Sequence, residues 1–210
     1  MRKVQVAPSV IQGHMMGLSQ MNAKWNYNGH KIYTYHHNRG ISNISHSDCC
    51  PGIYPKLILA GFVNTDAYNG KWSKSPYNFQ HYNVSSIGLK VNGQFTPSEP
   101  YTPNFAGADT AREFMSLYLS TGKAGMHEDD NGILQVDWAG GYTLYAFNLS
   151  PDLFLAGHGE PARISNINID VKFSVPLPEN VVLMLFCRYD TKIEITQLGN
   201  VILDPTQAAN

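Results

Sequence analysis

The chain has 210 residues, of which 43% are hydrophobic and only 15% are charged, with a formal net charge of −1. This composition excludes a disordered chain and gives no basic footprint for nucleic acid. The first residues lack the apolar core of a signal peptide, and no apolar run approaches the ~20 residues of a membrane span. We therefore expect a protein that is made and assembled inside the cell.

At the N-terminus, the alternation of Arg2–Ala7 predicts a short strand. Pro8–Asn22 then predicts a helix, because Ile11, Met15 and Leu18 repeat at helical spacing.

The middle of the chain reads as short strands separated by long polar loops. Asn92-Gly93 between two alternating segments is a strong hairpin signal, since both central positions of a type I′ turn need positive φ. Pro97, Pro100 and Pro103 are expected to break the pattern after it. The predicted strands are Lys31–His36, Lys56–Val63, Val84–Val91, Gln94–Thr96, Tyr142–Leu149, Ile164–Val175, Val181–Tyr189 and Lys192–Thr196.

A second helix is predicted over Asp109–Thr121, with Asp109 or Thr110 as the N-cap and Gly122 as the stop. Its expected inward face is Phe114, Leu117, Tyr118 and Thr121. About nine strands, two helices and no βαβ rhythm predict an all-β fold, an antiparallel sandwich of the jelly-roll or immunoglobulin-like kind. We expect one domain over residues 1–210: a strand and junction helix (1–26), the jelly-roll body (27–204) and a frayed tail (205–210).

Few residues suggest chemistry. The best metal candidate is the stretch that holds His36, His37, His46, Asp48, Cys49 and Cys50. Neighbouring residues on a strand point to opposite faces, and the spacing matches no zinc motif. We therefore interpret the stretch as a polar loop with an incidental Cys pair, and Cys187 as a buried apolar residue. No nucleophile elbow, P-loop or paired carboxylates occur, so we predict no enzyme, no metal and no cofactor.

Aromatic residues gather in the predicted loops: Trp25, Trp72, Trp138, Tyr68, Tyr77, Phe79, Tyr101 and Phe105. Exposed aromatics are typical of protein interfaces, and equally of small clusters that hold long loops to a sandwich. The sequence leaves both interpretations open.

Several strings resemble the major capsid proteins of Polinton (Maverick)-type animal elements and related viruses. They are RKVQVAPSVIQGH, LILAGFVNTDAYNGKWSKSPYNFQHYNVSSIGLKVNGQ, EFMSLYLSTGK, GYTLYAFNLSPDL and INIDVKFSVPLPENVVLMLFCRYDTKIEI. The resemblance covers nearly the whole chain and implies the C-terminal half of a double jelly-roll protein, whose three copies form a capsomer. Members of that family carry a further N-terminal jelly roll. We expect this chain to be an excised half, a stand-alone jelly roll, or one whose first half comes from another chain.

The first functional hypothesis is thus a structural capsid protein of the virion, with other copies of itself, as a homotrimer, and an N-terminal jelly roll as partners. Its predicted subunit-interface residues are Trp72, Tyr77, Phe79, Tyr101 and Phe105. The alternative is a carbohydrate- or receptor-binding jelly roll that uses exposed aromatics to stack on sugars. A cupin-like metal enzyme is the third hypothesis, but it needs inward histidines that the chain does not offer.

Overall fold

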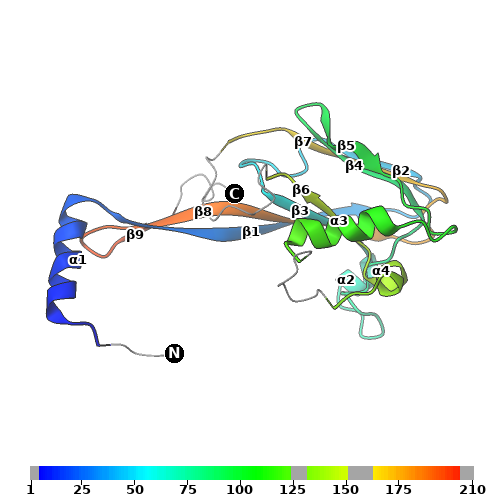
Figure 1. Cartoon of the computed structure of the whole chain (residues 1–210). Coiled ribbons are helices and arrows are strands. Elements are labelled where there is room, and N and C mark those ends of the chain that lie inside the picture. The colour runs from blue at the N-terminus through cyan, green and yellow to red at the C-terminus, as the bar shows by residue number, and fades with distance from the viewer. Residues whose placement is uncertain (1–4, 124–131, 151–162, 204–210) are drawn as a thin grey trace. The chain divides into compact units, whose positions relative to one another are not determined.

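The computed structural model describes residues 5–123, 132–150 and 163–203 (Figure 1). The chain groups into two compact units, one of residues 30–189 and one of residues 1–29 with 190–210. The single domain expected over residues 1–210 stays a prediction.

Two antiparallel sheets form the larger unit. One has the strand order β1-β8-β3-β6 and the other β2-β7-β4-β5. The strands of these sheets are β1 (Ala23–His37), β2 (Asn43–His46), β3 (Leu57–Asn64), β4 (Val84–Val91), β5 (Gln94–Tyr101), β6 (Leu144–Asn148), β7 (Ile167–Phe173) and β8 (Val181–Ile195). Strands β1 and β8 continue into the smaller unit.

The strand pairing is nested. β4 pairs with β5, β3 with β6, β2 with β7 and β1 with β8, so the chain behaves like one long hairpin rolled into two sheets. The pairs β3–β8 and β4–β7 then join neighbouring layers of that hairpin. This is a jelly roll, and it confirms the predicted all-β jelly-roll fold.

At the centre of the nest lies the predicted Asn92-Gly93 turn. Both residues have positive φ, 50° and 89°, which is the backbone of a type I′ hairpin. Val91 and Gln94 pair on either side of it, and β4 spans Val84–Val91 as predicted.

Strand β5 differs from the prediction because it runs through Pro97 and Pro100 to Tyr101. It can do so because it is an edge strand, where a missing backbone donor leaves no neighbour unpaired. The two closing segments predicted as separate strands form the single strand β8. The short strand β2 lies where a loop was expected.

The second predicted helix is confirmed as α3 (Ala111–Thr121), between β5 and β6. Thr110 is its N-cap and Gly122 ends it with a φ of 74°. Its buried side chains are Glu113, Leu117 and Ser120, so the inward face is rotated from the predicted one. Two further short helices are α2 (Thr65–Tyr68) and α4 (Gln135–Gly141).

Alternation places the core between the sheets. On β7, Ile167, Ile169, Val171 and Phe173 are buried, as their spacing predicts, whereas Val175 beyond the strand is 54% exposed. On β3, Ile58, Ala60 and Phe62 face the same core, while Val63 belongs to a second, smaller cluster. Because neighbouring residues of a strand face opposite sides, that second cluster lies on the outer face of the β1-β8-β3-β6 sheet.

The smaller unit contains the helix α1 (Pro8–Gln20), the outer parts of β1 and β8, and strand β9 (Val201–Leu203). Helix α1 has no buried residue; Ile11 and Met15, two members of the predicted apolar stripe, are 48% and 63% exposed. The strand predicted over Arg2–Ala7 falls partly outside the described residues, and residues 5–7 have no regular structure. Among the described helices, none is long and apolar enough to cross a membrane.

The central turn gives a first test of the fold. Gly93→Ala forces an L-residue into left-handed backbone, so we expect the free energy of unfolding in urea to fall by about 1 kcal/mol. Gly140→Ala is the matched control, because no atom lies within 4 Å of the added Cβ and the φ of Gly140 is not positive. Equal stability of the two variants would contradict the role of the turn.

Candidate functional site

Two of the five predicted interface residues lie at the surface. Trp72 is fully exposed (102%) and Tyr77 is 76% exposed. Both belong to the connection from α2 to β4, which we call the aromatic loop (residues 69–82). Their side chains are therefore available for contact with another molecule.

The other three predicted interface residues pack within the chain. Tyr101 is buried, and its hydroxyl donates to the carbonyl of Ala146 at 3.0 Å. Phe105 stacks between His81 and Trp138, with ring centroids 4.1 and 5.9 Å away. Trp138, expected in a loop, is fully buried in α4. For Tyr101 and Phe105 the structure thus supports the second interpretation of the aromatics, that of small clusters under loops.

Phe79 holds the aromatic loop to the outer face of the β1-β8-β3-β6 sheet. It packs on the cluster of Val63, Ala67 and Val182. Its backbone is fixed on both sides: its N–H donates to Gly141 at 2.7 Å, and its carbonyl accepts from Thr143 at 2.9 Å. Phe79 is therefore the anchor of the loop.

A polar contact anchors the same loop a second time. The carboxylate of Glu179, which lies between β7 and β8, accepts from the hydroxyl of Tyr82 at 2.7 Å and from the side-chain amide of Asn64. Burial and this carboxylate raise the pKa of Tyr82, so the hydroxyl stays a donor. Lys74 lies 3.7 Å from Glu179 and 3.4 Å from Asp66. The contacts of Phe79 and Tyr82 therefore fix the end of the aromatic loop to the sandwich, while Trp72 in the same loop stays exposed.

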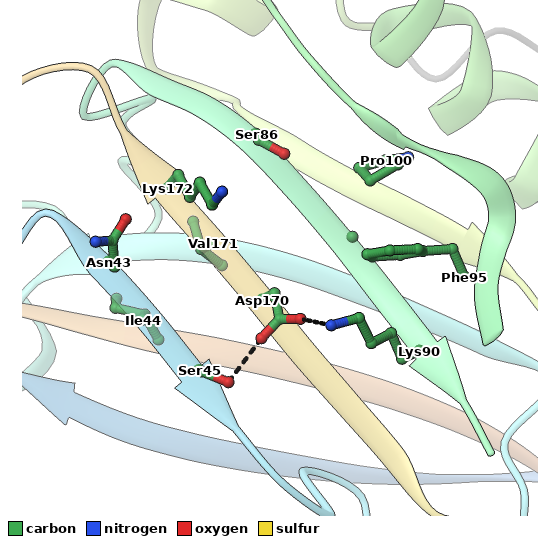
Figure 2. Close-up of a pocket in the computed structure, with 11 residues that line it drawn as sticks. Asn43, Ile44, Ser45, Ser86, Lys90, Phe95, Pro100, Asp170, Val171 and Lys172 are labelled. Atoms are coloured by element: carbon green, nitrogen blue, oxygen red, sulfur yellow. Dashed lines mark hydrogen bonds and ion pairs between the residues drawn. The ribbon is translucent and has the colours of Figure 1, made fainter. Parts of the chain in front are cut away.

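The outer face of the other sheet carries a hollow of about 380 Å³, shown in Figure 2. Residues that lie side by side on neighbouring strands form its rim. In one such row, Lys172 of β7 lies between Asn43 of β2 and Ser86 of β4. A neighbouring row joins Ser45, Asp170 and Gly88. We call this place the sheet hollow.

Gly88 makes the hollow possible. A Cβ at this position would stand 3.1 Å from Phe95 and 3.1 Å from Pro100, both on the edge strand β5. Without a side chain at Gly88, these two apolar residues close over the strand and give the hollow an apolar wall. No pattern in the sequence indicates this contact.

Charged groups line the rest of the hollow, and the ammonium group of Lys90 lies 4.9 Å from the centroid of the Phe95 ring. Asp170 accepts from Ser45 at 2.6 Å and pairs with Lys90 at 2.6 Å (Figure 2). These hydrogen bonds lower the pKa of Asp170. Lys172 is exposed and attracts the Asp170 carboxylate electrostatically, but among the described residues no carboxylate lies close enough to form an ion pair with it. The hollow thus combines an apolar wall, a carboxylate and an ammonium group.

The histidine stretch is only partly brought together. His37 and His46 meet with Nε2 atoms 3.1 Å apart, and Tyr35 stacks on His46. His36 turns to the other face and meets Tyr68 edge-on, as strand alternation predicts. Within the described residues, no three His, Cys, Asp or Glu side chains are placed to hold a metal ion.

The cysteines differ from the interpretation as a polar loop pair. Cys49 and Cys50 are buried, as is Cys187 on β8, whose burial was predicted. The Sγ of Cys50 lies 3.1 Å from that of Cys187 and 3.9 Å from that of Cys49. All three are free thiols. Cys49 and Cys50 belong to the β2–β3 connection, and their side chains join Cys187 in the main core cluster.

Comparisons with known proteins give a relative by sequence and two structural neighbours. No family model matches the chain. An uncharacterized protein of Caenorhabditis elegans, F54H12.2, is 24% identical over 152 residues, which cover 71% of this chain and 36% of that protein. Among solved structures, a chain of the Sputnik virophage structure has a TM-score of 0.50 at 14% identity, over 87% of this chain and 39% of that one. The mavirus major capsid protein has a TM-score of 0.46 at 14% identity, over 96% of this chain and 44% of that one.

The structural likeness to the virophage chain confirms the jelly-roll fold that the sequence resemblance implied. The chain spans about 36% of the length of the curated relative and about 39% of the virophage chain.

The histidine pair predicts a pH dependence of stability. Burial, then His46 and His36, lower the pKa of His37 to about 4, whereas an unfolded histidine titrates near 6.5. Between these values the unfolded chain binds a proton that the folded chain does not, so stability falls as the pH falls from 6.5 to 4. We expect a loss on the order of 1 kcal/mol by chemical denaturation, since solvent screens the partly exposed ring.

His37→Asn should flatten this decline. His36→Asn, on the opposite face of the same strand, should reduce it only slightly, because His36 is the smallest of the causes that lower the pKa of His37. The same slope in all three proteins would contradict the assignment.

The buried thiols predict low reactivity. The neighbouring thiols of Cys187 and Cys49, together with burial, raise the pKa of Cys50, and a thiol reacts as its thiolate. We expect none of the three cysteines to react with a disulfide reagent in the native protein, and all three to react in guanidinium. Rapid reaction of one native thiol would show that this part of the core opens.

Proposed function

We propose that this chain is a structural capsid protein, a jelly-roll building block that associates with other copies of itself. The observation that carries the proposal is the pair of exposed aromatics, Trp72 and Tyr77, on a loop that is anchored twice to a rigid sandwich. The fold shared with the virophage chain adds support, because that chain belongs to the structure of a virophage.

The physical logic of such a role is burial between subunits. Trp and Tyr are the residues that most often dominate the binding energy of protein interfaces. A loop that is already fixed loses little conformational freedom on binding, so more of the contact energy appears as affinity. Low overall charge reduces the desolvation cost of packing copies together.

Finer features of the role belong to the same proposal. We propose a homotrimer, a further jelly roll as a neighbour, and a place in the shell of a virion assembled inside the host cell. The chain acts through its surfaces, and no catalytic step is part of the proposal.

A carbohydrate-binding role is the second candidate, and one observation favours it. A polar cavity of about 290 Å³ adjoins the aromatic loop, with Asn64, Lys74, Asn78, Gln80 and Glu179 in its lining. Amide and carboxylate groups beside an exposed Trp suit the hydroxyls and apolar faces of sugars. Binding on a glycan array by a protein that stays monomeric would favour this role.

Self-association is the direct test of the capsid role. We expect light scattering after size-exclusion chromatography to show a mass that rises with concentration to a closed oligomer, visible as discrete rings or particles by negative-stain microscopy. The double variant Trp72→Ala/Tyr77→Ala should raise the concentration needed for half-association at least tenfold, about 1.4 kcal/mol, because each aromatic side chain buries a large area.

Met115→Ala is the control for that variant, because it removes an exposed apolar side chain from α3 rather than from the loop. A wild-type protein that stays monomeric at every concentration would contradict the capsid role of this chain.

A further inference from the structure

The aromatic loop and the sheet hollow lie on opposite sides of the sandwich. The loop is anchored to Val63 and Val182, which face outward from the β1-β8-β3-β6 sheet. The hollow is lined by Ser86 and Lys172, which face outward from the β2-β7-β4-β5 sheet. Figure 1 shows the same arrangement within the larger unit, with α2 and its loop on one side and β4 and β5 on the other.

We propose that Trp72 of one copy inserts into the sheet hollow of a second copy. The inference rests on the proposed self-association and deepens it, because it names both halves of the contact. The occupant is a second copy because the same chain carries a fully exposed indole and, elsewhere on its surface, a hollow whose groups match an indole.

The apolar part of the match is the wall made by Phe95 and Pro100 over Gly88. An indole that enters this space stacks beside the Phe95 ring and removes both aromatic surfaces from water. Phe95 and Pro100 close tightly over Gly88, where an added Cβ would stand 3.1 Å from each of them. The free space of the hollow therefore lies above its other lining residues, which include Ser45 and Ser86.

The polar groups of the hollow also suit an indole. A buried indole N–H needs an acceptor, and each carboxylate oxygen of Asp170 already accepts one hydrogen bond and has room for another. The ammonium group of Lys172 on the rim has no ion-pair partner among the described residues, and a cation over the indole face is favourable.

Opposite placement fixes the symmetry of the contact. A twofold dimer requires the same patch on both copies, whereas a protrusion on one face and a hollow on the other give a head-to-tail contact. Repetition of a head-to-tail contact closes into a ring when the rotation allows it and otherwise continues as a filament. The proposed contact therefore produces rings or filaments rather than symmetric dimers.

A complementation experiment tests the pairing. Trp72→Ala removes the protrusion and keeps the hollow. Ser86→Trp keeps the protrusion and fills the hollow, on a central strand that tolerates an aromatic residue. Each variant alone should lose at least tenfold in self-association, measured by light scattering at matched concentrations. An equimolar mixture should form one-to-one heterodimers that grow no further, because the free protrusion and the free hollow have both been removed.

Two controls accompany the variants. Met115→Trp adds a surface Trp on α3, none of whose residues lines the hollow, and should associate like the wild type. Circular dichroism and thermal melting establish that each variant is folded. If Ser86→Trp does not fold, Ser45→Trp fills the hollow from the exposed strand β2 instead.

The outcomes separate this inference from the proposed function. A monomeric wild type overturns both. A wild type that associates while either variant associates equally well overturns the inference and leaves the capsid role standing. Loss of association in both variants without pairing in the mixture also overturns it, because Trp72 and the hollow then belong to different contacts. One-to-one pairing in the mixture supports it.

Discussion

Nested strand pairing around the Asn92-Gly93 turn is the constraint on which the rest of this structure depends. Once β4 pairs with β5, the partner of every earlier strand is fixed, because each sits one layer further out in the same rolled hairpin. Register then decides which side chains face the core, since one residue of slip would turn every side chain over. The turn formed by these two positive-φ residues therefore helps to fix the register, and with it which side chains lie on the outer faces of the two sheets.

The outer faces of the two sheets differ in whether a loop covers them, although the side chains of both sheets alternate in the same way. The connection from β3 to β4 is long enough to fold back, and its Phe79 covers the outer face of its sheet. The connection from β4 to β5 is a two-residue turn, which can cover nothing. The second sheet therefore keeps an open row of polar side chains, broken only where Gly88 admits Phe95 and Pro100. Loop length decides which face stays available for a neighbouring molecule.

Features with local causes could be predicted from the sequence. Strand β4, its turn and helix α3 each follow from alternation, turn chemistry or a cap within a few residues. The continuation of β5 through its prolines could not be predicted, because it depends on β5 lying at a sheet edge. Of the predicted interface residues, Trp72 and Tyr77 are exposed, whereas Tyr101 turns inward to a partner 45 positions along the chain, Ala146. The sheet hollow could not be predicted from the sequence, because no sequence pattern shows that Phe95 and Pro100 pack over Gly88.

The nesting also sets an order in which the fold can be completed during synthesis. β1 is the first strand of the two sheets to be synthesised, yet its partner β8 emerges after every other strand except the short β9. Contacts between segments so far apart in sequence form slowly, and an unpaired strand edge can accept a strand from another chain. The outermost pair, β1 with β8, is thus the one most exposed to strand exchange between neighbouring nascent chains, and the central hairpin is the one best protected from it.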